Sequence, residues 1–167
     1  MQIRILDILE ETMADGPGLR TSIYCAGCAH HCPGCHNPQS WDFHGGREVS
    51  VDELLEIVKA DEFADVTFSG GDPLYQVEAF TELARRIKEE TGKNIWCYTG
   101  FTYEEIQADE RLSQILPYID TLVDGPFIAG LRDPELHFRG SSNQRIIHLH
   151  SEDEDQIPGT VPTVPYK

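Results

Sequence analysis

The residues best suited to chemistry in this chain are its cysteines. Four of the five cysteines fall within the thirteen residues Cys25–Asn37, where Gly27, Pro33 and Gly34 permit backbone turns that bulkier residues resist. Thiolates are the usual protein ligands of iron–sulfur clusters, and they also bind zinc. Cysteines at this density seldom serve only packing, so the stretch predicts a metal centre carried by one loop.

The spacing of these cysteines is open to several interpretations. A zinc site would use Cys25, Cys28, Cys32 and Cys35, but structural zinc usually takes two C-x2-C pairs separated by a longer loop than the three residues found here. A ferredoxin-like cluster with four protein ligands usually follows C-x2-C-x2-C-x3-C, which is a different order. Disulfides require an oxidising compartment and usually a small secreted chain. Buried structural thiols are the remaining alternative.

Composition restricts the class of protein. A chain of 167 residues, 40% hydrophobic and 25% charged, suits one soluble domain with a sizeable core. We find neither a signal peptide nor an apolar run long enough to cross a membrane, and free cysteines then predict the reducing cytoplasm. The net charge of −16 argues against a nucleic-acid binder, because phosphate contacts require Lys and Arg. We therefore expect neither a nucleic-acid nor a membrane partner.

Hydrophobic patterning predicts the elements that must position the cysteines. Two strands over 2–9 and 21–24 flank the turn Asp15–Gly18, and the second strand leads directly to the cysteines. Ser50–Glu53 and Thr102–Glu105 have the capping-box pattern of helix starts. A further helix is predicted over 77–87, ending near Gly92. The remaining predicted strands lie at 66–68, 95–98, 119–123 and 144–149.

The order of these elements predicts the fold class. Strands alternate with helices from residue 50 to about 124, as in parallel βαβ units, and turns at 70–73, 99–102 and 124–127 follow strands directly. In β/α barrels the functional loops lie at the carboxyl ends of the strands. The helices are too few for eight units, so we predict an α/β fold with a mostly parallel sheet in an open partial (β/α) barrel. Residues 1–150 would form this domain, and the acidic, Pro-rich residues 151–167 a flexible tail.

Three of the cysteines carry a family resemblance. The C-x3-C-x2-C spacing of Cys28, Cys32 and Cys35 resembles the radical S-adenosylmethionine (SAM) superfamily, in which three thiolates hold a [4Fe–4S] cluster and SAM chelates the fourth iron. With further blocks the chain more closely resembles the glycyl-radical activases of anaerobic ribonucleoside-triphosphate reductases. Those blocks are Asp15–Gly18, Gly27–Cys35, Ser69–Leu74, Trp96 with Tyr98–Gly100, Val123–Phe127 and Arg139–Gln144.

The resemblance implies roles for individual residues. The implied cluster ligands are Cys28, Cys32 and Cys35. The residues implied to bind SAM or to adjoin it are Gly34, Cys35, His36, Gly70, Gly71 and Asp72. The last three would meet the methionine end of SAM at a strand edge, where glycine lets a ligand approach the backbone closely. The cofactors carry the radical chemistry, so no catalytic acid or base is expected.

Several nearby residues fall outside that pattern. Cys25 lies outside the three-cysteine spacing, and we expect it to be a spare thiol near the cluster. His36 stands where relatives often have an aromatic residue, which weakens the expectation of ring stacking there. His30 and His31 are expected to be loop residues rather than metal ligands, and Cys97 to be a core thiol.

The resemblance also implies partners. The protein substrate would be the catalytic subunit of an anaerobic ribonucleoside-triphosphate reductase, and a flavodoxin-type protein would donate electrons. Rival hypotheses are an activase of another glycyl-radical enzyme, of the formate-lyase type, and a non-enzymatic zinc-binding module using four cysteines. The sequence leaves open whether the chain forms a homodimer.

Overall fold

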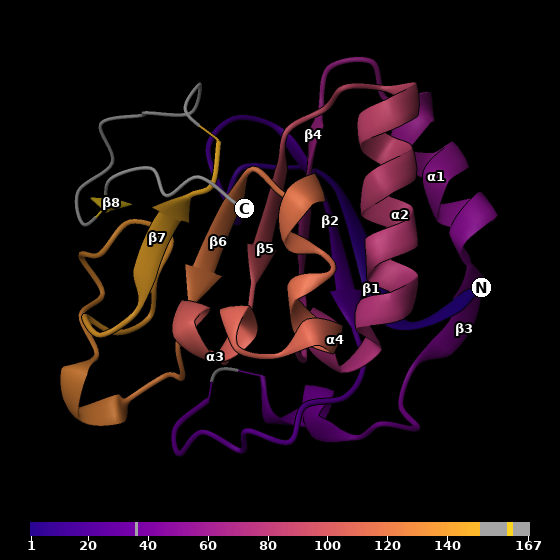
Figure 1. Cartoon of the computed structure of the whole chain (residues 1–167). Helices are drawn as coiled ribbons and strands as arrows, with labels where there is room; N and C mark the ends of the chain where they lie inside the picture. Colours follow the sequence, from indigo (N-terminus) through magenta and orange to yellow (C-terminus); the bar gives the residue numbers. More distant parts are fainter. Residues whose placement is uncertain (36, 151–159, 162–167) are drawn as a thin grey trace.

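One mixed β-sheet runs through the computed structural model, which describes residues 1–35, 37–150 and 160–161 (Figure 1). The strand order is β3-β1-β2-β4-β5-β6-β7-β8. The strands are β1 Gln2–Thr12, β2 Arg20–Cys25, β3 Arg47–Ser50, β4 Asp65–Gly70, β5 Ile95–Tyr98, β6 Thr121–Asp124, β7 Arg145–His148 and β8 Thr160–Val161. The predicted tail at 151–167 lies, apart from β8, outside the described residues.

The centre of the sheet is parallel. Strand β2 pairs with β4, β4 with β5, and β5 with β6, all in parallel register. Strands β1 and β3 extend one side in antiparallel pairing, and β7 pairs antiparallel with β6 on the other side. The predicted α/β class with a largely parallel core is confirmed, and the sheet stays open, with β3 and β8 at its two edges.

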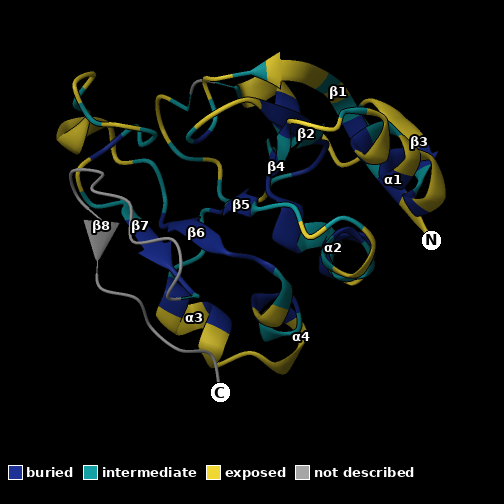
Figure 2. Cartoon of the chain, turned by 90° about the horizontal axis from the view of Figure 1, so that it is seen from above, coloured by how far each residue is buried: buried dark blue, intermediate teal, exposed yellow. Residues whose placement is uncertain are grey.

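Helices cover one side of this sheet (Figure 2). The helices are α1 Val51–Ala60, α2 Val77–Glu90, α3 Tyr103–Gln107 and α4 Glu110–Ser113, with short 3-10 turns at Pro38–Trp41, Pro73–Gln76, Leu116–Tyr118 and Ala129–Leu131. The apolar stripe of α1 is buried at Val51, Leu54, Leu55 and Val58. Burial of this stripe, rather than helix propensity alone, holds a helix of ten residues in place.

Local signals set where these helices begin and end. The Ser50 hydroxyl accepts a hydrogen bond from the Glu53 backbone N–H (3.0 Å), which caps α1. At α3 both halves of the predicted capping box form between Thr102 and Glu105. Helix α2 ends at Glu90, close to Gly92 as expected, and at Gly92 a φ of +69° favours glycine while its N–H bonds back to the Ile87 and Lys88 carbonyls.

Each face of the sheet carries its own apolar cluster. On the helix side Ile23, Phe68 and Cys97 belong to one large apolar core. On the opposite side Trp96 packs with Val123 and Ile146 in a second cluster. Strand β5 is thus buried on both faces, as its continuous apolar run predicted. Alternation along each strand therefore gives one face to the helices and the other face to the smaller cluster around Trp96.

Candidate functional site

The cysteine loop lies at the carboxyl end of the parallel strands. It follows β2 and runs along the edge toward which β2, β5 and β6 point (Figure 1). The Gly71 N–H donates to the Cys25 carbonyl (2.8 Å), and the Asp72 N–H donates to the Gly27 carbonyl (2.9 Å). The end of β4 is thereby joined to the start of the loop, in the position expected of a functional loop in a β/α fold.

The four clustered cysteines divide into three and one. Cys28, Cys32 and Cys35 are partly exposed on the loop. Cys25 is fully buried in the apolar core on the helix side of the sheet, and burial raises the pKa of its thiol well above the ordinary value. The four-thiolate zinc and ferredoxin interpretations both require Cys25 to face the other three. Cys97 is a core thiol, as predicted.

The three loop thiols are a donor set that suits an iron–sulfur cluster. Among the described residues, no three His, Cys, Asp or Glu side chains form a group that could hold one metal ion. Zinc would draw its ligands to one point, whereas a [4Fe–4S] cluster takes each thiolate on a different iron and so requires wider spacing. The donor set of soft thiolates on a Gly- and Pro-rich loop is consistent with such a cluster.

The Cys28 sulfur lies in a mixed environment. Burial raises the pKa of its thiol to about 11, while hydrogen bonds from the backbone N–H groups of His30 and His31 act in the opposite direction. These N–H groups favour the thiolate, which is the form that binds iron. At the other end of the loop, the Asn37 N–H lies 3.5 Å from the Cys35 sulfur. A backbone donor therefore faces the Cys35 sulfur.

Gly70 and Gly71 are required by the packing of backbone on backbone. A Cβ atom at Gly70, where φ is +106°, would lie 2.3 Å from the Cys25 nitrogen. A Cβ at Gly71 would lie 2.5 Å from the Gly27 carbonyl oxygen. We expected these glycines to admit a ligand, and the structure gives a different reason, which is that β4 and the cysteine loop could not otherwise meet.

Asp72 is buried and fully engaged. Its side chain is 1% exposed, and its Oδ1 atom accepts a hydrogen bond from the Leu74 N–H (3.0 Å). Its Oδ2 atom accepts from the Thr99 hydroxyl and the Gly100 N–H (2.9 Å each), and lies 2.7 Å from the His30 Nε2 atom. The carboxylate thus connects the ends of β4 and β5 to the cysteine loop. Protein groups engage both of its oxygens, so a role toward SAM would rest on the surrounding backbone.

Gly34 lies against a second loop, residues 126–131, which follows strand β6. Gly34 has a φ of +78°, and a Cβ there would contact Phe127 (3.4 Å) and Ala129 (3.5 Å). Ile128 and Leu131 in the same segment are more than 40% exposed. His36, the other predicted neighbour of the last cysteine, lies outside the described residues.

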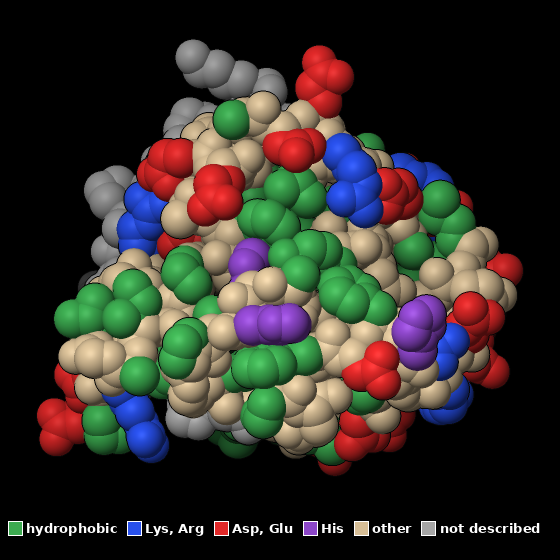
Figure 3. All heavy atoms as spheres, turned by 90° about the horizontal axis from the view of Figure 1, so that it is seen from below, with side chains coloured by type: hydrophobic (Ala, Val, Ile, Leu, Met, Phe, Trp, Pro, Cys, Tyr) green, Lys and Arg blue, Asp and Glu red, His purple; other side chains and the backbone are tan. Residues whose placement is uncertain are grey.

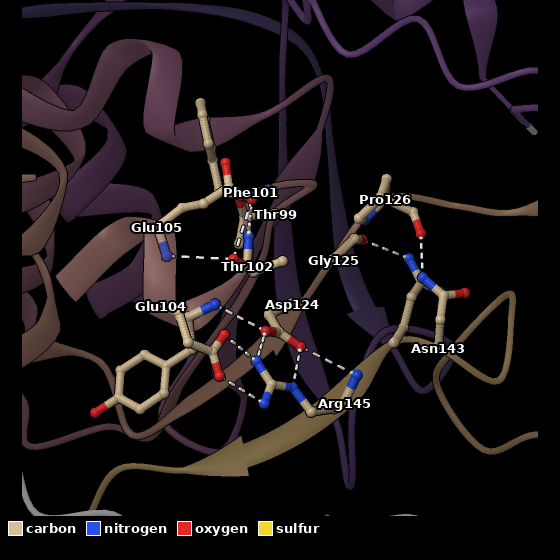
Figure 4. Close-up of polar contacts among 12 residues, drawn as sticks. Thr99, Phe101, Thr102, Glu104, Glu105, Asp124, Gly125, Pro126, Asn143 and Arg145 are labelled. Atoms are coloured by element: carbon tan, nitrogen blue, oxygen red, sulfur yellow. Dashed lines mark hydrogen bonds and ion pairs between the residues drawn. The ribbon is translucent and has the colours of Figure 1, made fainter. Parts of the chain in front are cut away.

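The Arg139–Gln144 block forms hydrogen bonds with the start of that second loop (Figure 4). The Asn143 side-chain amide donates to the Pro126 carbonyl (2.7 Å), and the Gln144 amide donates to the Gly125 carbonyl (3.0 Å). Next to it, the Asp124 carboxylate receives the Arg145 guanidinium, which also reaches Glu104. The block therefore fixes the turn that follows β6.

Two residues that the sequence reasoning missed also hold the site. Gln76 exchanges hydrogen bonds with the backbone of Arg4 (2.9 and 3.1 Å) and donates to the Ala26 carbonyl (3.1 Å) at the start of the loop. The His30 ring meets Asp72, as described above. Neither residue has a local sequence signal, because each acts on segments that are distant in the chain.

Viewed from the side of the cysteine loop, the surface is apolar at its centre (Figure 3). Hydrophobic side chains gather around histidines near the middle of this face, and acidic side chains lie mainly toward the periphery. Phe43, which is 42% exposed, packs against Gly27 and Tyr75. An apolar surface of this kind suits a reaction that must exclude water. Within the described residues, no helix has the length and apolar character needed to cross a membrane.

Comparison with known proteins agrees with this geometry. Residues 14–147 match a family described as a 4Fe-4S single cluster domain. The chain is 37% identical over 145 residues to the anaerobic ribonucleoside-triphosphate reductase-activating protein of Escherichia coli (strain K12), covering 82% of this chain and 93% of that protein. It is 40% identical to the protein of the same name from Haemophilus influenzae, covering 80% and 90% of the two chains. The enterobacteria phage T4 protein of that name is 34% identical, with coverage of 79% and 85%.

Proposed function

Because the chain belongs to the family of anaerobic ribonucleoside-triphosphate reductase-activating proteins, we propose that it is a radical SAM enzyme that generates a glycyl radical on such a reductase. The observation that carries the proposal is the division of the cysteines. Three partly exposed thiols share one loop at the carboxyl edge of the sheet, and the fourth faces the core.

Cys28, Cys32 and Cys35 would hold a [4Fe–4S] cluster, leaving one iron for SAM. When bound, the cluster and SAM supply the one-electron chemistry that removes a hydrogen atom from a glycine of the reductase. The residues of this chain bind, orient and exclude water. Gly70 and Gly71 bring the edge of β4 against the loop, so backbone groups there would meet the methionine end of SAM.

The remaining roles concern the other end of the loop and the partners. Gly34 and His36, which flank Cys35, would contact SAM. A protein substrate would present a peptide segment at the carboxyl edge of the sheet, beside the cysteine loop. A flavodoxin-type protein would supply the electron.

The proposal is tested by anaerobic reconstitution with iron and sulfide. The protein should then contain iron and sulfide in equal amounts, and should form 5′-deoxyadenosine from SAM and a reductant. With the reductase present, electron paramagnetic resonance should detect a glycyl radical. The matched pair is Cys32→Ala, which should lose the iron, and Cys97→Ala, which should keep it.

Two results would refute the proposal. Zinc without iron in anaerobically prepared protein would favour the rival hypothesis of a non-enzymatic zinc-binding module. A glycyl radical on a formate-lyase-type enzyme, with none on the reductase, would place the chain with a different activase.

A further inference from the structure

Two adjacent histidines lie between the first two loop cysteines and face opposite ways. His31 is exposed, and its ring stacks on Trp41 at a centroid distance of 4.6 Å. The His30 side chain is turned inward and is only 16% exposed. A large polar side chain that is mostly buried beside candidate cluster ligands needs partners inside the protein.

The His30 ring is bound to a carboxylate that cannot move. Its Nε2 atom lies 2.7 Å from the Asp72 Oδ2 atom. That oxygen already accepts hydrogen bonds from the Thr99 hydroxyl and the Gly100 N–H. Nε2 must therefore be the donor, because the carboxylate oxygen acts as an acceptor toward all of its partners. One hydrogen bond joins the cysteine loop to the ends of β4 and β5.

Aromatic rings fix the plane of the imidazole. Phe101 packs edge to face on His30 at 4.6 Å, and Tyr75 packs at 5.4 Å. On the remaining side, a Cβ atom at Gly100 would lie 2.5 Å from the His30 Cδ2 atom. Glycine at 100 thus leaves a space that the imidazole fills, and the ring has one orientation available.

The loop has little else to hold it. Between described residues 29 and 35, one backbone–backbone hydrogen bond forms, from the Cys35 N–H to the Cys32 carbonyl (3.0 Å). Cys28 and Cys32 flank this stretch, so its conformation sets where two of the three candidate ligands lie. Contacts outside the backbone must therefore hold the loop, and the His30 side chain supplies one of them to Asp72.

We propose that His30 is a positioning residue that locks the cysteine loop onto β4 and β5 before any cofactor binds, and so sets where the Cys28 and Cys32 sulfurs lie. The second half of the statement rests on the proposed function, in which these two cysteines are cluster ligands. The groups that orient the ligands of an iron–sulfur cluster are among the factors that set its reduction potential.

The test uses two amides that differ by one methylene. The longer side chain of His30→Gln can reach Asp72, whereas that of His30→Asn is too short. In the protein without iron, amide hydrogen exchange of segment 28–35 should be roughly tenfold faster in His30→Asn than in the wild type, and within roughly threefold of the wild type in His30→Gln. His44→Asn, at an exposed histidine outside the loop, is the control and should match the wild type.

A second measurement concerns the reconstituted protein. The loop carries the candidate ligands Cys28 and Cys32, so loosening it should shift the reduction potential of His30→Asn away from that of the wild type, with His30→Gln restoring it. Equal exchange and equal potentials in the two variants would overturn the lock. Absence of a cluster in the wild type would instead refute the proposed function, and the exchange data without iron would still decide the first half of the inference.

Discussion

At the scale of single residues, Cys25 separates the three-ligand hypothesis from its rivals. It is fully buried on the helix side of the sheet, and strand β4 separates its strand from that of Cys97. Cys25→Ala should therefore keep its iron after anaerobic reconstitution and lose about 1 kcal/mol of unfolding free energy, because a buried thiol is replaced by a smaller group. Iron analysis and denaturant unfolding measure the two quantities.

Cys97→Ala is the control for this experiment, since Cys97 is equally buried and lies on a different strand. Both variants should lose similar stability and keep their iron. If Cys25→Ala lost its iron while Cys97→Ala kept it, the zinc and ferredoxin interpretations would gain support, and the assignment of ligands would be wrong.

The variant Gly71→Ala tests whether strand β4 must contact the cysteine loop for the protein to be stable and to hold iron. The Cβ of Gly71→Ala would lie 2.5 Å from the Gly27 carbonyl oxygen, which belongs to the backbone and cannot rotate away. We expect a loss of about 1–3 kcal/mol of unfolding free energy and reduced iron content, because the loop must shift. At Gly130 a Cβ would have nothing within 4 Å. Gly130→Ala should leave both quantities unchanged, and an equally mild Gly71→Ala would disprove the argument from packing.

At the scale of elements, patterns that act within one segment were predictable from the sequence. The helices after Ser50 and Thr102 begin where their caps predicted, because capping depends on residues three positions apart. Strand β3 was missed, since Arg47–Ser50 is short and mostly polar and is held by pairing with β1. The antiparallel pairing of β7 was likewise not evident, because periodicity does not encode the direction of a partner strand.

The turn after β6 depends on one ion pair that joins two elements (Figure 4). Asp124 is 1% exposed, and its Oδ2 atom lies 2.5 Å from the Arg145 Nη2 atom. Arg145→Met should lower the unfolding free energy by about 3 kcal/mol, because it leaves a buried carboxylate without its cation. Adding Asp124→Asn should restore part of the loss in denaturant unfolding. A double variant less stable than either single variant would contradict this account.

The outer half of the same network predicts a pH dependence. The hydrogen bond from Arg145 lowers the pKa of Glu104 below its ordinary value. A lowered folded-state pKa adds stability above the unfolded pKa, and that stability is lost as the pH falls through the folded value. The Glu104 side chain is 64% exposed, so the gain is limited to about 1 kcal/mol.

Glu104→Gln should therefore be less stable than the wild type at neutral pH, and the difference should shrink as the pH falls below about 4.3. Denaturant unfolding across the acid range measures it. The same substitution in the Arg145→Met background, where the ion pair is absent, is the control and should show a much smaller difference. A difference that grew toward acid pH would have the wrong sign.

At the scale of the whole molecule, the contacts that complete the site join segments far apart in the chain. His30 and Asp72 are 42 positions apart, and Gln76 meets Arg4 across 72 positions. The sequence could predict that turns at 70–73 and 99–102 share one edge of a parallel sheet, and the structure brings both to Asp72. It could not predict that the Asp72 carboxylate serves the protein itself, because that depends on which groups the folded loop presents.

Net charge is the other property that belongs to the whole chain. With 29 acidic and 13 basic residues, the chain has a net charge of −16, and repulsion among the excess acidic groups destabilises the folded state. Raising the salt concentration from about 0.01 M to about 0.15 M shortens the Debye length from about 30 Å to about 8 Å. Screening should raise the thermal unfolding midpoint by roughly 2–4 °C, since relief of this repulsion outweighs the weakening of exposed ion pairs.

Charge variants distinguish this effect from a specific ion site. Glu10 and Glu62 are exposed and line one shallow surface hollow. The double variant Glu10→Gln/Glu62→Gln should have a higher midpoint at low salt and a smaller response to salt. Arg47→Gln removes an exposed cation and should respond more strongly than the wild type. A midpoint that fell on adding salt, or equal responses in all three proteins, would show that local ion pairs rather than overall repulsion govern the stability of the fold.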